Sequence, residues 1–442
     1  MGYSLMCGAG FVEKTPSSKT LFERAKSVLP GGVSYSIRYF DPYPIYVSRA
    51  KGQRIWDLDG NAYTDYWMGH GALIMGHGYR PVIEAVRNQL EKYGHVGFPH
   101  EWEVRLAEQV SRMMRSIELL RFTNSGTEAA MYSIRLARAY TGKRFVGKFE
   151  GGWHGSYDCL HLGVNPPYDL PGSLGILPES LKYTVILPYN DLEGVRRLVK
   201  SLDLAAIVVE PVLGAGGAIP AEPEFLKGLR ELCDELDALL IFDEVITGFR
   251  LSPGGAQQVY GVKPDLTILG KILGGGFPVG GFGGRRDVME LLDQLKRPDP
   301  RKRVFQGGTF AANPITTRAG YALLKDLNEN PEIYRRINEL GERARRGIEE
   351  AFEKHGLTGY TTGLGSMIGI HFTPEKPRDA RYAQLNRDLK LARSLFKHML
   401  DNGVIYLTQE NPHLFISASH TREDIEKLIA LAEDFARTSS TL

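Results

Sequence analysis

The chain has few of the features that mark membrane, nucleic-acid-binding or disulfide-rich proteins. No apolar run approaches the ~20 residues that a membrane helix needs. The 54 basic and 52 acidic residues leave a net charge of only +2, so we expect neither nucleic acid nor an acidic membrane as a partner. With 442 residues of ordinary composition, the chain is long enough for a large core and more than one domain.

Cysteine is also scarce. Cys7, Cys159 and Cys233 are too few and too scattered for a disulfide framework or a metal site, and we expect ordinary thiols in a reducing compartment. The first residues, MGYSLMCGAGFVEK, contain no basic segment and no long apolar stretch, so no secretory signal is expected. These absences favour a cytoplasmic protein without a metal ion.

The middle of the chain alternates short apolar runs with amphipathic helical patterns. Apolar runs at 205–211, 238–245 and 266–270 are separated by segments such as EFLKGLRELCDEL, in which leucines recur on one helical face. This alternation predicts an α/β fold with a mostly parallel sheet covered on both faces. Ligands of such sheets bind beyond the carboxyl ends of the strands.

The two ends of the chain have a different pattern. Residues 17–28 predict a short amphipathic helix, and 44–66 predict two strands joined by a turn at Asp59-Gly60-Asn61. A charged helical region at 331–355 leads to a smaller α+β unit with candidate strands MIGIHF, VIYLTQ and HLFISAS. We predict an N-terminal segment (1–75) that contributes to the small domain, a large domain (76–325) and a C-terminal small domain (326–442).

A possible anion site lies at 125–127. Ser125, Gly126 and Thr127 precede a helical pattern, and the first turn of a helix offers free N–H groups and a favourable dipole to a phosphate. The alternative is a plain helix cap. A second signal is Asp243, which ends the apolar run IFDEV (241–245). It is either a solvated strand end or the partner of a buried cation.

Lys271 follows the apolar run LTILG and precedes Gly274-Gly275-Gly276. Burial there would lower the pKa of the amine and free its lone pair to attack a carbonyl group. The alternative is a lysine that extends its amine to solvent. The adjacent glycines favour the buried site, because they let a cofactor approach the backbone closely.

Together, a phosphate site, a strand-end carboxylate and a buried lysine are what pyridoxal phosphate requires. The chain resembles the class III (ω-type) pyridoxal-phosphate-dependent aminotransferases, nearest the branch of glutamate-1-semialdehyde aminomutases and β-amino-acid aminotransferases. The matching segments are NSGTEA, KFEGGWHG, VVEPV, LIFDEVITGFR, GVKPDLTILGKILGGGFPVG and FQGGTFAANP, in that order. The resemblance implies fold type I: a large domain with a mostly parallel seven-stranded sheet and a smaller α+β domain formed by the two chain ends.

The resemblance also implies roles for individual residues. Lys271 and Asp243 are the catalytic pair: the lysine carries the cofactor as a Schiff base, and the aspartate pairs with the ring nitrogen. The other implied cofactor-binding residues are Ser125, Gly126 and Thr127 at the phosphate, Trp153 and Val245 on the two faces of the ring, His154 and Glu210 near Asp243, and Thr309. The last would reach the phosphate of the neighbouring subunit, which implies a homodimer with shared active sites.

The substrate side departs from the aminomutase pattern. Arg38 in GGVSYSIR matches an arginine that would bind a substrate carboxylate, with a surface arginine as the alternative, but Tyr35 and Ser36 replace a Ser-Pro pair. His70 replaces a pocket tryptophan, and Pro412 stands where the aminomutases have a glutamate. We therefore predict Tyr35, Arg38 and His70 as substrate-binding residues.

These departures favour one reaction over two others. An aminomutase must retain its intermediate, whereas an aminotransferase must release a keto product and admit a second substrate, so altered pocket residues favour the aminotransferase. It would move an amino group from a small-molecule donor to a keto-acid acceptor by a ping-pong mechanism. The alternatives are a glutamate-1-semialdehyde 2,1-aminomutase and, less favoured, an amino-acid racemase. A non-catalytic regulatory protein would have lost Lys271 or Asp243, and both are present.

Overall fold

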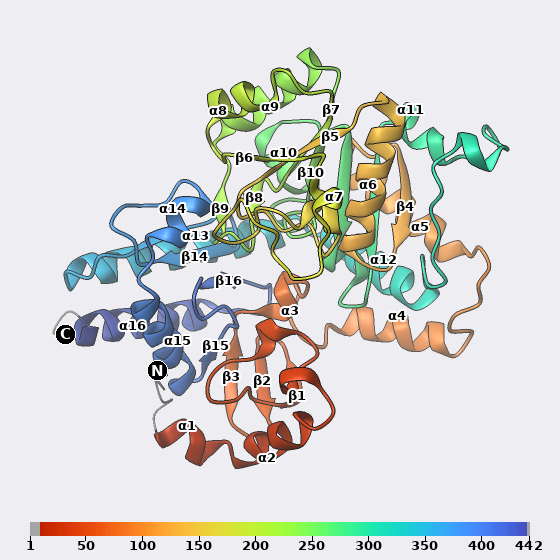
Figure 1. Ribbon diagram of the computed structural model, residues 1–442. Helices are drawn as coiled ribbons and strands as arrows, with labels where there is room; N and C mark the ends of the chain where they lie inside the picture. Colours follow the sequence, from red (N-terminus) through yellow and green to blue (C-terminus); the bar gives the residue numbers. More distant parts are fainter. Residues whose placement is uncertain (1–8, 440–442) are drawn as a thin grey trace.

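The computed structural model describes residues 9–439 and is built around one large mixed sheet (Figure 1). The strand order is β4-β12-β11-β10-β7-β5-β6, and only β12 runs antiparallel to its neighbours. The strands are β4 (Leu119–Thr123), β5 (Phe145–Phe149), β6 (Thr184–Leu187), β7 (Leu204–Val209), β10 (Leu239–Asp243), β11 (Leu266–Gly270) and β12 (Gly280–Gly284). The predicted seven-stranded, mostly parallel sheet is therefore confirmed.

Helices cover both faces of this sheet, as its unbroken apolar strands require. In β10, Leu239 and Ile241 lie in the core shared with α6 (Gly126–Thr141), whereas Leu240 and Phe242 lie in the core shared with α8 (Leu192–Val199) and α9 (Pro223–Glu235). α5 (Glu101–Met113) packs on β4 and on α12 (Pro314–Glu329), and α12 also packs on α4 (Arg80–Leu90) and on the turn 271–274 after β11.

The two chain ends meet in a second sheet below the large one in Figure 1. Its order is β1-β2-β3-β15, with β1 (Val47–Lys51), β2 (Arg54–Asp57) and β3 (Ala62–Asp65) from one end and β15 (Val404–Ile405) from the other. The predicted turn at Asp59-Gly60 joins β2 to β3, and β15 runs parallel to β3. The division into domains at residues 75 and 325 stays a prediction.

The C-terminal unit adds a third sheet, β13-β14-β16, formed by β13 (Tyr360–Thr362), β14 (Met367–His371) and β16 (His413–Phe415). Its helices are α13 (Glu332–Lys354), α14 (Ala380–Leu385), α15 (Leu389–Asp401) and α16 (Arg422–Ser439). Thr421 precedes α16 as predicted, and its hydroxyl accepts a hydrogen bond from the N–H of Asp424 at 3.3 Å. The predicted strand VIYLTQ is strand only at Val404–Ile405, because the chain then turns towards the cavity described below.

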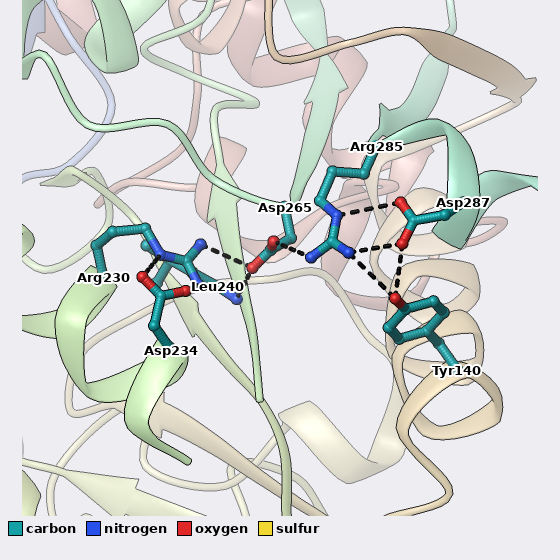
Figure 2. Close-up of polar contacts among 7 residues, drawn as sticks. All are labelled: Tyr140, Arg230, Asp234, Leu240, Asp265, Arg285 and Asp287. Atoms are coloured by element: carbon teal, nitrogen blue, oxygen red, sulfur yellow. Dashed lines mark hydrogen bonds and ion pairs between the residues drawn. The ribbon is translucent and has the colours of Figure 1, made fainter. Parts of the chain in front are cut away.

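An ion-pair network lies at the end of the large sheet where β10 and β11 begin, away from the carboxyl end of β10 (Figure 2). Asp265, which directly precedes β11, accepts hydrogen bonds from the N–H of Leu240 at 2.8 Å, from Arg230 at 2.7 Å and from Arg285 at 2.8 Å. Arg230 lies on α9, and Arg285 directly follows β12. A single buried carboxylate therefore joins two parallel strands, the antiparallel strand and a covering helix.

No helix within 9–439 is long and apolar enough to cross a membrane. Cys159 and Cys233 are buried free thiols, and Cys7 lies outside the described residues. No group of three or more potential metal ligands was found in the described part of the chain.

Candidate active site

A cavity of about 1020 Å³ opens beyond the carboxyl ends of the parallel strands, where ligands of such sheets bind. Eleven of the thirteen predicted site residues line it: Tyr35, His70, Ser125, Gly126, Thr127, Trp153, His154, Glu210, Asp243, Val245 and Lys271. The structure therefore brings together segments that lie more than 200 residues apart in the chain. The other two, Arg38 and Thr309, are exposed and are not part of the wall.

The anion site begins at the N-terminus of α6. Ser125 is the N-cap, and its hydroxyl accepts a hydrogen bond from the N–H of Glu128 at 3.2 Å. The N–H groups of Gly126 and Thr127 lie in the first turn and have no carbonyl partner in the helix. A Cβ on Gly126 would approach a methyl group of Val245 to 3.2 Å, so the helix end and Val245 are packed closely together.

Asp243 ends β10 and is 4% exposed. One carboxylate oxygen lies 2.7 Å from Nδ1 of His154, and the other accepts the N–H of Val245 at 3.0 Å. A carboxylate can only accept, so Nδ1 carries the proton of His154. Burial lowers the pKa of His154 despite this partner, which keeps the imidazole neutral and its Nε2 unprotonated. That Nε2 is buried without a partner among the described residues.

Glu210 lies beside Asp243 and supports the loop that carries Trp153. Its two oxygens accept the N–H groups of Trp153 at 2.8 Å and Gly214 at 3.0 Å. Burial, reinforced by the negative charge of Asp243, raises the pKa of Glu210 to about 8. Two neighbouring carboxylates therefore do not both carry a full charge at neutral pH.

Lys148 is a buried residue that the sequence analysis missed. It lies on β5 with no exposed surface, and its amine donates to the carbonyls of Gly152 at 2.9 Å and Leu162 at 2.6 Å. These two bonds fix both sides of the loop that carries Trp153 and His154. Burial lowers the pKa of Lys148 to about 7. The signal was available in KFEGGWHG, where a lysine interrupts an apolar strand.

Lys271 follows β11 with a φ of +46°, an unusual backbone conformation for a residue with a side chain. Burial lowers the pKa of its amine, although Asp243 and Glu210 act in the opposite direction. The glycines after it have a different role from the expected one. A Cβ on Gly275 would lie 2.8 Å from the carbonyl oxygen of Ala319 on α12, so Gly275 is required by helix packing. Of the three glycines, only Gly276 lines the cavity.

Aromatic rings line the substrate side. His70 stacks on Tyr35 with ring centres 5.6 Å apart and meets Trp67 edge-on at 4.5 Å. Burial lowers the pKa of His70 to about 4, so this imidazole is neutral at physiological pH. Trp67 was not predicted, and its Nε1 is buried without a partner among the described residues.

The chain from 407 to 415 and the turn after α14 complete the wall. Glu410, Asn411 and His413 line the cavity, whereas Pro412 is buried behind them and its carbonyl accepts the N–H of Ile370 at 2.9 Å. Position 412 therefore contributes no side chain to the pocket, and its carbonyl instead binds β14 of the third sheet. Arg387 also lines the cavity. Arg387 was not predictable from a motif, because it lies in none.

These residues fit pyridoxal phosphate. The free N–H groups of α6 suit a phosphate, the buried carboxylate of Asp243 suits a protonated ring nitrogen, and the partly buried amine of Lys271 suits an aldehyde. The unpartnered Nε2 of His154 adds a polar contact that a bound group could satisfy. The fold and this wall therefore define a fold type I pyridoxal-phosphate enzyme.

Comparisons with known proteins identify the family. The family model "Aminotransferase class-III" matches residues 35–431. A glutamate-1-semialdehyde 2,1-aminomutase of Methanosarcina acetivorans is 44% identical over 93% of this chain and 96% of its own length. The chain therefore belongs to the class III aminotransferase family, and the predicted recognition is confirmed.

Solved structures agree with this assignment. An ω-transaminase from Sphaerobacter thermophilus has a TM-score of 0.91 and 36% identity, covering 98% of this chain and 100% of its own. A transaminase described as having pyridoxal phosphate bound has a TM-score of 0.86 and 32% identity, covering 97% of this chain and 99% of its own.

Proposed function

We propose that the chain holds pyridoxal phosphate on Lys271 and moves an amino group on a small molecule. The main support is the position of a partly buried amine, a buried carboxylate and a helix N-terminus on one cavity wall. When bound, the cofactor would supply a reactive aldehyde and an electron-accepting ring. Ser125, Gly126 and Thr127 would hold the phosphate, and Asp243 would pair with the ring nitrogen.

The protein groups would act as follows. Lys271 is partly buried, and the burial of its amine lowers its pKa and so favours the unprotonated form, which could bind the aldehyde and then take up and return a proton. His154 and the N–H of Val245 would hold the Asp243 carboxylate in place. Trp153 and Val245 would enclose the ring from both faces and exclude water.

Two reactions are candidates for this site. The curated relatives are named as aminomutases and match almost the whole chain, so they favour the predicted alternative over the preferred aminotransferase. We therefore propose a glutamate-1-semialdehyde 2,1-aminomutase as the first candidate. The aminotransferase is the second candidate. It is supported by His70 and Tyr35 on the cavity wall, where they depart from the aminomutase pattern, and by the likeness to the ω-transaminase.

One experiment separates the two candidates. The purified protein, loaded with pyridoxal phosphate, is given glutamate-1-semialdehyde alone or an amino donor with pyruvate. Formation of 5-aminolevulinate without an acceptor supports the aminomutase, and acceptor-dependent ping-pong turnover supports the aminotransferase. Borohydride reduction followed by mass spectrometry should place the pyridoxyl group on Lys271. A label on another lysine would contradict both candidates.

We also propose the homodimer with shared sites. Thr309 is exposed and lies outside its own cavity, and Phe305 and Phe310 beside it in the chain, like Phe98 in the segment around 95, are exposed apolar side chains. The rings of His95 and Phe310 lie 4.8 Å apart, so the segments around 95 and 310 lie side by side. A surface of this kind suits a second copy of the chain.

A further inference from the structure

Arg250 is fully buried and has no acid partner among the described residues. It follows the segment after β10 that carries Asp243 and Val245, and none of its side chain is exposed. Its hydrogen bonds go to carbonyl and hydroxyl oxygens. Burial lowers its pKa to about 10, so the guanidinium is still charged at neutral pH. A buried charge without a counter-charge is costly, so these hydrogen bonds have to compensate for that cost.

The guanidinium of Arg250 joins three segments that are far apart in the chain. One of its terminal nitrogens donates to the carbonyl of Gly71, which ends the turn 68–71. The other donates to the hydroxyl of Ser366 and to the carbonyl of Ile416, both at 3.3 Å. Ser366 directly precedes β14, and Ile416 directly follows β16. The guanidinium therefore links the segment after β10 to the N-terminal turn and to the third sheet.

Two side chains of the cavity wall depend on these links. His70 and Phe415 both line the cavity, and each directly precedes a residue whose carbonyl accepts a hydrogen bond from Arg250. The guanidinium also lies 5.2 Å from the centre of the Phe415 ring. A Cβ on Gly71 would approach that ring to 3.0 Å, so the turn and the ring pack directly on one another.

The cofactor side of the cavity is fixed without this guanidinium. Glu244 directly follows β10 and is 1% exposed. Its carboxylate accepts four hydrogen bonds, from Thr247, from Ala256 and twice from Gln257, at 2.6 to 3.1 Å. These bonds hold the end of β10 to α10 (Gly255–Tyr260) and to the intervening turn. The side chain of Arg250 is therefore free to hold the other side of the cavity.

We propose that Arg250 is a positioning residue, which sets His70 and Phe415 on the substrate side of the cavity against the cofactor side. This inference rests on the proposed function for the identity of the two sides. Loss of Arg250 should weaken binding of the substrate that reacts and leave the cofactor on Lys271 unchanged.

The test uses steady-state kinetics of the enzyme loaded with pyridoxal phosphate. The substrates are glutamate-1-semialdehyde, or an amino donor with pyruvate, whichever the wild type turns over. Arg250→Met should raise KM roughly tenfold or more, because it removes the donors of a charged group. The affinity for pyridoxal phosphate, titrated by its absorbance, should stay within about twofold of the wild type. Arg250→Lys should raise KM less, because an ammonium keeps the charge but lacks the fork that reaches all three acceptors.

Arg345 provides a matched control. It is also buried, and it donates to the carbonyls of Gly365 at 2.7 Å and Met367 at 2.6 Å. Neither these acceptors nor their neighbours in the chain line the cavity. Arg345→Met should therefore lower stability, as any loss of a buried donor does, but leave KM within about twofold of the wild type.

Hydrogen–deuterium exchange adds a measurement that does not depend on activity. In Arg250→Met the amides of 68–73 and 414–417 should exchange faster, whereas those of 241–247 should not change. In Arg345→Met the amides of 68–73 should keep their wild-type rates.

Three results would overturn the inference: an unchanged KM in folded Arg250→Met, a cofactor affinity that falls in parallel with the rise in KM, or unchanged exchange at 68–73. If Arg250→Met does not fold, Arg250→Lys decides by the same measurements. Failure of the proposed function is seen separately, as absence of a pyridoxyl label on Lys271 of the wild type, and the exchange measurement still tests the role of Arg250 in that case.

Discussion

At the scale of single residues, the site depends on side chains that fixed neighbours hold in place. Asp243 has two fixed partners, the imidazole of His154 and the N–H of Val245. Replacing it with Asn should preserve its shape but remove the charge that would keep a ring nitrogen protonated. We expect a loss of about 3 kcal/mol, or roughly 100-fold in kcat. Steady-state kinetics checks this, and near wild-type turnover would show that another carboxylate holds the ring.

Lys148 gives a prediction about pH. Its pKa falls from 10.5 in the unfolded chain to about 7 in the folded protein. Between these values the unfolded chain binds more protons, so this residue makes the free energy of unfolding rise with pH. Lys148→Met should remove that rise, and the gap between the urea midpoints of wild type and variant should widen from pH 7 to pH 9.

Lys143 provides the control for this prediction. Its amine also donates to two backbone carbonyls, those of Leu236 and Asp237, but near the surface. The offset between Lys143→Met and the wild type should stay constant over the same pH range. A constant offset for Lys148→Met as well would show that the buried lysine is not the source of the slope.

Individual residues also show where sequence reasoning succeeds. Asp243 and Lys271 were predictable because the first ends and the second directly follows an apolar strand, and parallel strands bring their carboxyl ends to one side of the sheet. Ser125 was predictable because a helical pattern follows it. Trp67 and Arg387 were not predictable, because they lie on irregular connections whose position depends on the packing of the two chain ends. Arg38 was predicted from a motif, but the motif does not fix on which side of the turn the guanidinium lies.

At the scale of elements, the turn at 68–71 is the most unusual. Met68, Gly69, His70 and Gly71 all have positive φ angles. The carboxylate of Asp65 accepts the N–H groups of Trp67 and Met68, and Arg250 donates to the carbonyl of Gly71, so the turn is held at both ends. The left-handed conformation costs a residue with a side chain roughly 1–2 kcal/mol. The strain at His70 places an imidazole in the cavity.

A matched pair of variants tests this strain. His70→Ala and His70→Gly both remove the imidazole, but only glycine adopts a φ of +59° without cost. We expect His70→Gly to be more stable than His70→Ala by about 1 kcal/mol in chemical denaturation. Equal stability would mean that the turn relaxes once the ring is gone.

The Asp265 network belongs to the same scale (Figure 2). Asp265→Asn breaks a buried ion pair and should cost about 3–5 kcal/mol in the free energy of unfolding. The folded fraction should keep its kcat, because the network lies at the end of the sheet that is opposite the cavity. Asp234→Asn is the control: this side chain is 67% exposed although it pairs with Arg230, and its loss should cost under about 1 kcal/mol. Equal losses in the two variants would contradict the central role of Asp265.

At the scale of the whole molecule, the proposed dimer makes a prediction about mixtures. Lys271→Ala subunits are inactive in their own site, and a Thr309→Ala subunit would impair only its partner's site. A hybrid of the two would contain one site with both defects and one intact site, so activity should partly recover on mixing. Mass spectrometry should first demonstrate that the subunits exchange. If activity then does not recover, or if a stable monomer is fully active, the shared site is refuted.

The parallel pairing of β3 with β15 has a consequence for biosynthesis. A ribosome that adds about 5–20 residues per second reaches Ile405 roughly 20–70 s after Asp65. During this time β3 presents an unpaired strand edge, a known template for aggregation. We expect the nascent chain to need shielding at β3 by a chaperone until the last strand of that sheet emerges.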